Sequence, residues 1–278
     1  MVFLLLAILS SAMIAILMRI STNRIGANLS MLSVNYLVCA FLGAVYTGFR
    51  PAMPADPGFF TMLWLCLVSG CLYLGGFVLC QYNTRKNGVV LTSIFMKLGL
   101  LVPVAMSMLV FREVPTPTQI AGFCIAVAAI VVINLKKEES GHGFGLSLVG
   151  MLLLCGGSDA MSKVYERMGS AALSDSYLLV TFASAFCLCA VLARCRREAP
   201  GWAEILFGAL IGIPNFFSAK FLLAALTKLS AVVVYPSFSV ATLLIVTLTG
   251  VMVFREKLIR RQWVALGAIL SALVLLNI

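Results

Sequence analysis

The chain has 278 residues, of which 62% are hydrophobic and only 11% charged, whereas water-soluble domains are typically about 45–50% apolar and about 25% charged. A soluble protein of this length could not bury so much apolar surface in one core, but a lipid bilayer solvates it directly, so we predict a membrane protein. The formal net charge of +10 would suggest nucleic acid in a soluble protein. Here the basic residues stand between apolar runs, as in the loops of membrane proteins, and we expect no nucleic-acid partner.

Ten apolar runs follow one another along the chain, and most are close to the roughly 20 residues that a helix needs to cross a bilayer. The segments between them carry turn residues or charges. Strands are not expected, because an open strand in lipid leaves its backbone groups without hydrogen-bond partners. The predicted fold class is an all-α integral membrane protein with ten transmembrane helices, at residues 2–20, 28–48, 59–82, 88–110, 117–134, 145–163, 173–194, 203–227, 231–253 and 262–277.

An internal repeat with an offset of 143 residues relates the two halves of the chain. Residues 89–134 align with residues 232–277 without a gap, and Val110-Phe111-Arg112-Glu113 falls on Val253-Phe254-Arg255-Glu256. We therefore predict two five-helix repeats, at 1–137 and 143–278. Because five is odd, the second repeat must enter the bilayer from the opposite side. Such inverted repeats are typical of alternating-access transporters with a midplane substrate site.

Each half ends in an apolar span, a short Phe-Arg-Glu turn and a last helix rich in Gly and Ala. The residues that carry this pattern are 111–113 with Thr118, Gln119 and Gly122, and 254–256 with Gln262 and Gly267. The layout resembles the EamA branch of the drug/metabolite transporter (DMT) superfamily. The resemblance implies a multi-pass cell-membrane protein that moves small metabolites, with amino-acid export as a common activity. Relatives with the same helices act as flippases for lipids or lipid carriers.

Three ionisable residues stand clear of the predicted helix ends: Lys97, Asp159 and Lys220. A charge at the middle of a span costs at least about 2.5–3.5 kcal/mol, and such residues usually face a bundle interior or an aqueous path. Lys97 is interpreted as a cavity-facing cation that binds an anionic group, with a structural tether to a carbonyl or to Asp159 as the alternative. Asp159 lies four residues before Lys163, so it either pairs with that lysine along the helix or serves as a proton or cation site.

Lys220 lies on a helical face that carries both aromatic and polar residues. Three residues share this face by their three- and four-residue spacing: Phe216, Leu223 and Thr227. The repeat places the face over Tyr73 and Phe77 of the first half, so related faces occur in both halves. A pseudo-symmetric substrate cavity needs such a pair of faces, although packing of Phe and Leu alone gives the same pattern.

Other polar residues in the spans are weaker candidates. Asn215 and Tyr235 are assigned to the substrate cavity, with hydrogen bonding between helices as the alternative. Glu113 and Glu256, each beside an arginine at a helix end, are interpreted as anchors at the membrane interface. The sequence has no carboxylate cluster for a metal and no hydrolase or metalloprotease motif. We therefore predict no metal site, no cofactor and no enzymatic activity.

Together these features predict a secondary active transporter of small metabolites, such as amino acids or organic anions, that works by alternating access. Because two of the three mid-span charges are lysines, substrates with a carboxylate or phosphate are favoured. A proton or sodium ion is a candidate coupling ion, and the chain is expected as a monomer or homodimer. The alternative is a lipid or lipid-carrier flippase, which would need a groove open to the bilayer. Basic residues gather in the loops after odd-numbered spans, which places both termini outside the cytoplasm, whereas the resemblance implies cytoplasmic termini.

Overall fold

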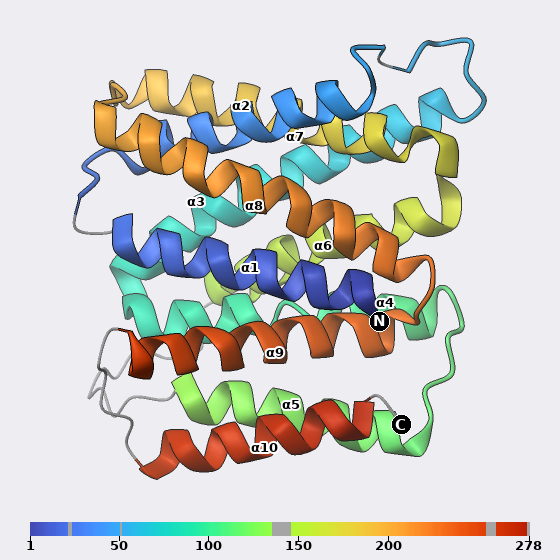
Figure 1. Ribbon diagram of the computed structural model, residues 1–278, viewed down its shortest axis with the longest axis vertical. Helices are drawn as coiled ribbons and strands as arrows, with labels where there is room; N and C mark the ends of the chain where they lie inside the picture. Colours follow the sequence, from blue (N-terminus) through green and yellow to red (C-terminus); the bar gives the residue numbers. More distant parts are fainter. Residues whose placement is uncertain (22–23, 51, 135–145, 254–259, 277–278) are drawn as a thin grey trace. The chain divides into compact units, whose positions relative to one another are not determined.

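The computed structural model describes residues 1–278 apart from 22–23, 51, 135–145, 254–259 and 277–278. Over these residues the chain forms ten α-helices and one short 3-10 helix, and no strand (Figure 1). The helices are α1 (Val2–Ser21), α2 (Asn28–Tyr46), α3 (Phe59–Leu98), α4 (Leu101–Leu109), α5 (Pro117–Asn134), α6 (Leu146–Met168), η1 (Ala171–Leu173), α7 (Ser174–Cys195), α8 (Trp202–Leu226), α9 (Ala231–Met252) and α10 (Arg260–Leu276).

Six stretches of helix in the described part of the chain are long and apolar enough to cross a membrane. They are Val2–Ser21, Asn28–Tyr46, Phe59–Cys80, Ala171–Cys195, Trp202–Leu226 and Ala231–Met252. On α1, for example, the large apolar side chains of Leu5, Leu9 and Met13 are exposed along one side. A continuous apolar face of this kind is unfavourable in water and is covered by lipid in a membrane protein. The structure therefore supports an all-helical membrane protein.

The third and fourth predicted spans differ from the observed helices. Helix α3 continues through Asn87 and Gly88, where a turn was predicted, and the chain breaks only at Gly99. Asn and Gly lower helix stability by roughly 0.7–1 kcal/mol each, which does not suffice to end a long helix. Pro103 has no N–H to donate to the Gly99 carbonyl, and its ring crowds that group. The Val102 N–H donates to the Gly99 carbonyl instead, at 3.0 Å, and α4 begins there as a separate short helix.

The helices pack as two compact units, each drawn from both halves of the sequence. Unit 1 comprises Met1–Leu74 and Val164–Thr227, and unit 2 comprises Gly75–Lys163 and Lys228–Ile278. Helices α3 and α6 each continue from one unit into the other. The predicted repeats at 1–137 and 143–278 are continuous in sequence, whereas each unit combines helices from both repeats. The units therefore do not test the repeats, which stay a prediction.

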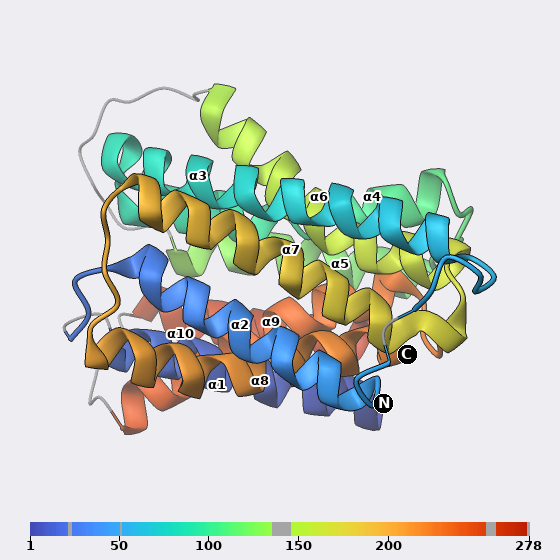
Figure 2. The same ribbon diagram turned by 90° about the horizontal axis from the view of Figure 1, so that it is seen from above.

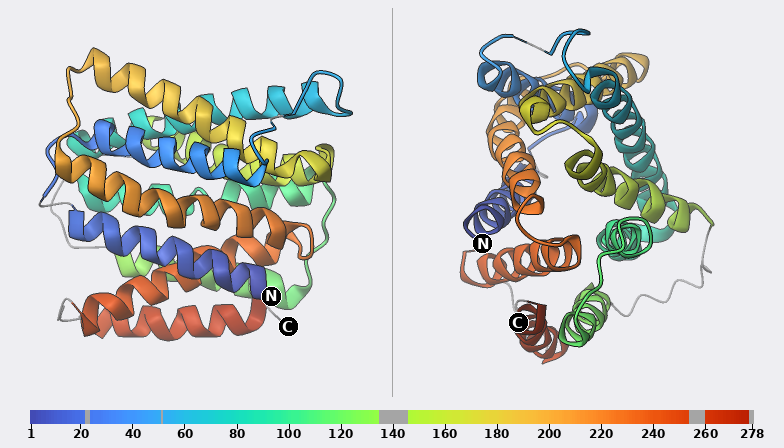
Figure 3. Two further views of the ribbon diagram at one scale, coloured as in Figure 1. Left: turned by 45° about the horizontal axis from the view of Figure 1, so that its top comes forward. Right: turned by 90° about the vertical axis from the view of Figure 1, so that its right-hand side faces the viewer.

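In unit 1, helix α2 lies against α7 and α8, and α1 lies against α8 (Figure 2, Figure 3). Two glycines let the α8 backbone approach α2 closely. A Cβ atom at Gly208 would stand 2.7 Å from the carbonyl oxygen of Met31, and one at Gly212 would stand 2.8 Å from that of Asn35. This contact fixes the middle of α8, and therefore the position of Lys220 roughly two turns further along the same helix.

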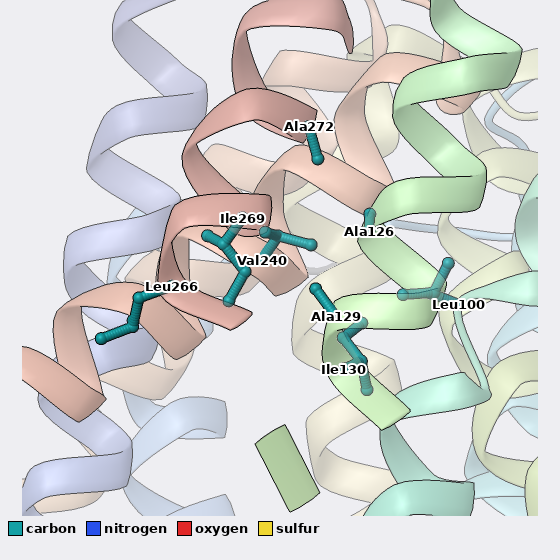
Figure 4. Close-up of a cluster of buried hydrophobic side chains, with 8 residues drawn as sticks. All are labelled: Leu100, Ala126, Ala129, Ile130, Val240, Leu266, Ile269 and Ala272. Atoms are coloured by element: carbon teal, nitrogen blue, oxygen red, sulfur yellow. The ribbon is translucent and has the colours of Figure 1, made fainter. Parts of the chain in front are cut away.

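Unit 2 has an apolar core where α5, α9 and α10 meet. Figure 4 shows its buried side chains, which are Leu100, Ala126, Ala129, Ile130, Val240, Leu266, Ile269 and Ala272. Opposite the end of α10, a Cβ atom at Gly122 would lie 3.0 Å from atoms of Leu275 and Leu276. Small residues at such contacts allow helices in membranes to approach closely and gain dispersion contacts.

Candidate functional site

Helices α2, α7 and α8 of unit 1 bring together one basic, one acidic and one aromatic side chain. The Lys220 ammonium on α8 donates a hydrogen bond to Oδ1 of Asp175 on α7 at 2.8 Å. Its Nζ atom lies 3.4 Å from the centre of the Tyr46 ring, at the end of α2. The side chains of Lys220 and Asp175 are 25% and 35% exposed, so both charges remain accessible to a ligand. We call these three residues the ion-pair site.

Local structure favours the acidic and the aromatic side chain at their positions. Asp175 lies in the first turn of α7, where the positive end of the helix dipole stabilises a carboxylate. Lys220 lies about two turns before the end of α8, too far from that end for the dipole to contribute. The Tyr46 ring stacks on Phe216 with centroids 5.5 Å apart and meets Phe217 edge to face at 6.1 Å. Aromatic packing therefore fixes the ring beneath the ammonium group.

A cavity of about 250 Å³ opens beside the ion-pair site, and we call it the Lys220 cavity. It lies at the end of α6, along η1 and the start of α7, and at the end of α8. Its lining includes Tyr165, Glu166, Asp175, Lys220, Leu223 and Thr227. Lys220 thus shares the cavity with two members of its predicted face, Leu223 and Thr227. The third member, Phe216, is fully buried in the aromatic packing instead.

A second cavity, of about 430 Å³, lies between the end of α2 and the start of α7, and we call it the Arg50 cavity. Its lining includes Tyr46, Thr47, Arg50, Asp56, Asp175 and Ser176. The chain turns sharply after α2 because Gly48 and Phe49 have φ angles of 63° and 57°, and the Phe49 N–H closes the helix on the Ala44 carbonyl at 2.8 Å. Asp175 belongs to the lining of both cavities, so a ligand in either one meets its carboxylate.

The Lys220 cavity has more acidic than basic groups in its lining. Lys220 supplies an ammonium, and Asp175 and Glu166 supply two carboxylates. Glu166 also lies 3.6 Å from Nε of Arg167, which offsets its charge. A simple organic anion would meet the Asp175 carboxylate as well as the Lys220 ammonium. A ligand that carries an ammonium group would meet attractive charges, which differs from the expectation based on two lysines.

Tyr165 forms an apolar part of the cavity wall. Its ring stacks on that of Tyr177 with centroids 3.9 Å apart, and its hydroxyl donates to the Ser170 carbonyl at 2.7 Å. Because the hydroxyl is engaged within the chain, the ring contributes mainly apolar surface. The predicted span at 145–163 ends too early to include Tyr165, which lies in the last turn of α6.

Two further predicted site residues lie in unit 1. The Asn215 amide donates to Oδ1 of Asn35 at 3.2 Å, which is the helix–helix hydrogen bond considered as the alternative to a cavity role. Tyr73 lies on α3 and is partly buried. Neither residue is part of the Lys220 cavity lining.

Asp159 and Tyr235 lie in unit 2 and are brought together there. The Tyr235 hydroxyl donates to the backbone carbonyl of Asp159 at 2.8 Å, which ties α9 to α6. The Tyr235 side chain is buried, whereas Asp159 is exposed. The contact is a structural link between the two helices.

Glu113 lies at the centre of a buried polar network, which corrects its interpretation as an interfacial anchor. Its Oε1 atom is 2.7 Å from Nζ of Lys163, and the two side chains are 10% and 2% exposed. Its Oε2 atom accepts hydrogen bonds from the Ser107 hydroxyl and from the Ala231 N–H, one of the N–H groups that a helix start leaves without an intrahelical partner. The structure thus pairs Lys163 with Glu113.

The side chains of Lys97 and Phe77 lie outside the described part of the structure, as do residues 254–259 with Glu256. The backbone of Lys97 is described, and it is the penultimate residue of α3, next to the break at Gly99. The roles predicted for these side chains stay predictions.

Tyr46, Arg50 and Asp175 are among the lining residues of the two cavities that the sequence did not single out. All three lie at or beyond a helix end, whereas the predicted site residues lie within the spans. Asp175 could have been found by asking which carboxylate in the first turn of a helix can neutralise a lysine within a span.

No family model matches the chain. It is 21% identical to a Haemophilus influenzae protein described as uncharacterized, over 97% of this chain and 95% of that protein. It is also similar to a solved crystal structure with a TM-score of 0.72 and 17% sequence identity, over 99% of this chain and 94% of the other. At that level of identity the likeness shows a shared fold along almost the whole chain, and the fold alone.

Proposed function

We propose that the chain is a secondary active membrane transporter of small metabolites, with amino acids as the substrate class, and that the Lys220 cavity holds the substrate. The observation that carries the proposal is the Lys220–Asp175 ion pair at the edge of that cavity, in a protein with helices apolar enough to cross a membrane. The volume of about 250 Å³ is below the roughly 300–1,000 Å³ of pockets for drug-sized ligands. It suits a metabolite the size of an amino acid.

The charges of the cavity favour amino acids over organic anions. An amino acid carries an ammonium and a carboxylate, which complement Asp175 and Lys220, whereas a ligand with negative charge alone would draw Lys220 away from Asp175 and leave that carboxylate without its counter-ion. Phosphate or dicarboxylate ligands would need a further cation in the lining.

The packing of the helices supports alternating access by an inverted repeat. Within the units, α2 packs against α7, α4 against α9, and α5 against α10. If each repeat contains five spans, α2 and α7 are equivalent helices of the two repeats, as are α4 and α9, and α5 and α10. A pseudo-two-fold axis in the membrane plane brings equivalent helices together in this way.

Counterflow into proteoliposomes tests the proposal. Vesicles with the purified wild-type chain are loaded with an unlabelled mixture of amino acids and diluted into the radiolabelled mixture. We expect uptake well above that of protein-free vesicles, loss of uptake for Asp175→Asn, and unchanged uptake for Lys228→Met, which removes an exposed lysine outside the cavity lining. Absence of amino-acid counterflow by the wild type would refute the proposal. Movement of fluorescent phospholipid between leaflets without amino-acid counterflow would support the flippase.

A further inference from the structure

The ammonium group of Lys220 occupies a position that two other side chains define. The Asp175 carboxylate accepts its hydrogen bond at 2.8 Å, and the Tyr46 ring presents its face at 3.4 Å. A carboxylate forms a strong charge-assisted hydrogen bond with an ammonium group. An aromatic face attracts the same group through its quadrupole, and more strongly when water is partly excluded. The two contacts together are suited to any alkylammonium ion.

Asp175 and Tyr46 are held in place by contacts that do not involve Lys220. The Tyr46 ring packs on Phe216 and Phe217, and Asp175 is part of the first turn of α7. Lys220 instead reaches them on a flexible four-carbon stem that has several rotatable bonds. The carboxylate and the ring therefore form a fixed subsite, and the Lys220 ammonium is its tethered occupant.

We propose that Asp175 and Tyr46 form an ammonium subsite that Lys220 fills in the empty protein and vacates for the ammonium group of the substrate. The inference rests on the proposed function and specifies how that site recognises its ligand. The ligand is a primary amine, and in an amino acid the carboxylate then pairs with the displaced Lys220.

The exchange keeps every charge of the site compensated. In the empty protein Asp175 is neutralised by Lys220. In the complex Asp175 is neutralised by the ligand ammonium, and Lys220 by the ligand carboxylate. Because an unpaired charge in a partly buried site is costly, a zwitterion can displace Lys220, whereas a simple anion would add negative charge beside Asp175. The Asp175 carboxylate lines both cavities, so an ammonium group can reach it from either one.

The test removes the tethered ammonium and supplies a free one. Lys220→Met keeps an unbranched side chain without its charge, and the purified full-length variant is titrated calorimetrically with n-butylammonium in detergent micelles at neutral pH. We expect a dissociation constant at least about tenfold lower than for the wild type, where the tethered group competes at an effective concentration on the order of millimolar. Lys228→Met, the matched control, should bind butylammonium as the wild type does. Butyrate, an anion of similar size, should gain no affinity for Lys220→Met.

Adding Asp175→Asn to Lys220→Met should abolish the gain in affinity. Equal affinity of the wild type and Lys220→Met for butylammonium, or a gain that survives Asp175→Asn, would overturn the subsite. If Lys220→Met is not monodisperse, Lys220→Gln takes its place with a smaller expected gain, because its amide can still donate to Asp175 but carries no charge to compete with butylammonium. A failed titration with amino-acid counterflow intact refutes the subsite alone. Butylammonium binding without any counterflow supports the subsite and refutes the transporter.

Discussion

The buried pair of Glu113 and Lys163 should make a large contribution to the stability of unit 2. Oε1 of Glu113 and Nζ of Lys163 are 2.7 Å apart, and the two side chains are 10% and 2% exposed. If one side chain is removed, water therefore cannot take its place beside the other. Loss of one member of a buried pair typically costs about 3–5 kcal/mol, because the remaining charge is left without its counter-ion. Lys163→Met should cost about 3 kcal/mol, the lower end of that range, since Ser107 and the Ala231 N–H still donate to Glu113.

The double variant Glu113→Gln/Lys163→Met separates the pair from its surroundings. The double variant leaves no isolated charge at this position. Its loss in free energy of unfolding should therefore be smaller than the sum of the losses in the two single variants by at least about 1 kcal/mol, which is within the range of coupling between neighbouring residues. The free energy of unfolding is measured by SDS titration in mixed micelles, followed by tryptophan fluorescence. Arg167→Met is the control, because the Arg167 side chain is 44% exposed, so its removal should cost less than removal of the buried Lys163. A Lys163→Met protein as stable as this control, or single costs that simply add, would refute the reasoning.

Three further predictions concern packing, hydrogen bonding and topology. Gly212→Val should destabilise the protein by about 1–3 kcal/mol through overpacking, because a Cβ atom there would stand 2.8 Å from the Asn35 carbonyl oxygen. Gly267→Ala is the control: its Cβ atom would meet no atom within 4 Å, so it should be neutral or stabilising in the same SDS titration. Tyr235→Phe should cost about 0.5–1.5 kcal/mol for its hydrogen bond to the Asp159 carbonyl, and a change below about 0.3 kcal/mol by that titration would contradict the contact. The distribution of basic residues predicts termini outside the cytoplasm, so a C-terminal reporter that is active only in the cytoplasm should stay inactive, and an active fusion would reverse the orientation.

The helical fold could be predicted from hydrophobicity because long apolar runs separated by polar or turn residues favour helices in a bilayer. Most predicted bounds lie within a few residues of the helices, as for 2–20 and 117–134. The break between the third and fourth spans could not be placed in this way. Asn87-Gly88 has the composition of a turn, but the backbone turns only at Gly99, where Pro103 removes a hydrogen bond. Composition indicates whether a segment favours a helix on average, whereas the missing N–H of Pro103 ends the helix at one particular residue.

The candidate site was predicted in part. Lys220 and its neighbours Leu223 and Thr227 follow from helical spacing, and they do line one cavity. The counter-ion Asp175 lies 45 residues away in the sequence, and Tyr46 comes from a different half of the chain. Only the packing of α2, α7 and α8 brings them together. Local spacing offers only Asp159 as a partner for Lys163, and the pair with Glu113 could not be predicted, because the period of one helix does not encode contacts between segments distant in the sequence.

Protection of the Lys220 cavity by substrate is the most direct test that this cavity is the site of an amino-acid transporter. Thr227→Cys, at an exposed position of the cavity lining, is introduced into a chain whose nine native cysteines have been replaced, and its labelling by a water-soluble maleimide is measured in proteoliposomes. We predict that the labelling rate falls at least several-fold with a saturating amino-acid mixture, while Lys228→Cys, outside the cavity, labels at the same rate with and without it. Labelling of Thr227→Cys that is unaffected by the mixture, in vesicles that show amino-acid counterflow, would contradict the account, because the substrate would then bind elsewhere.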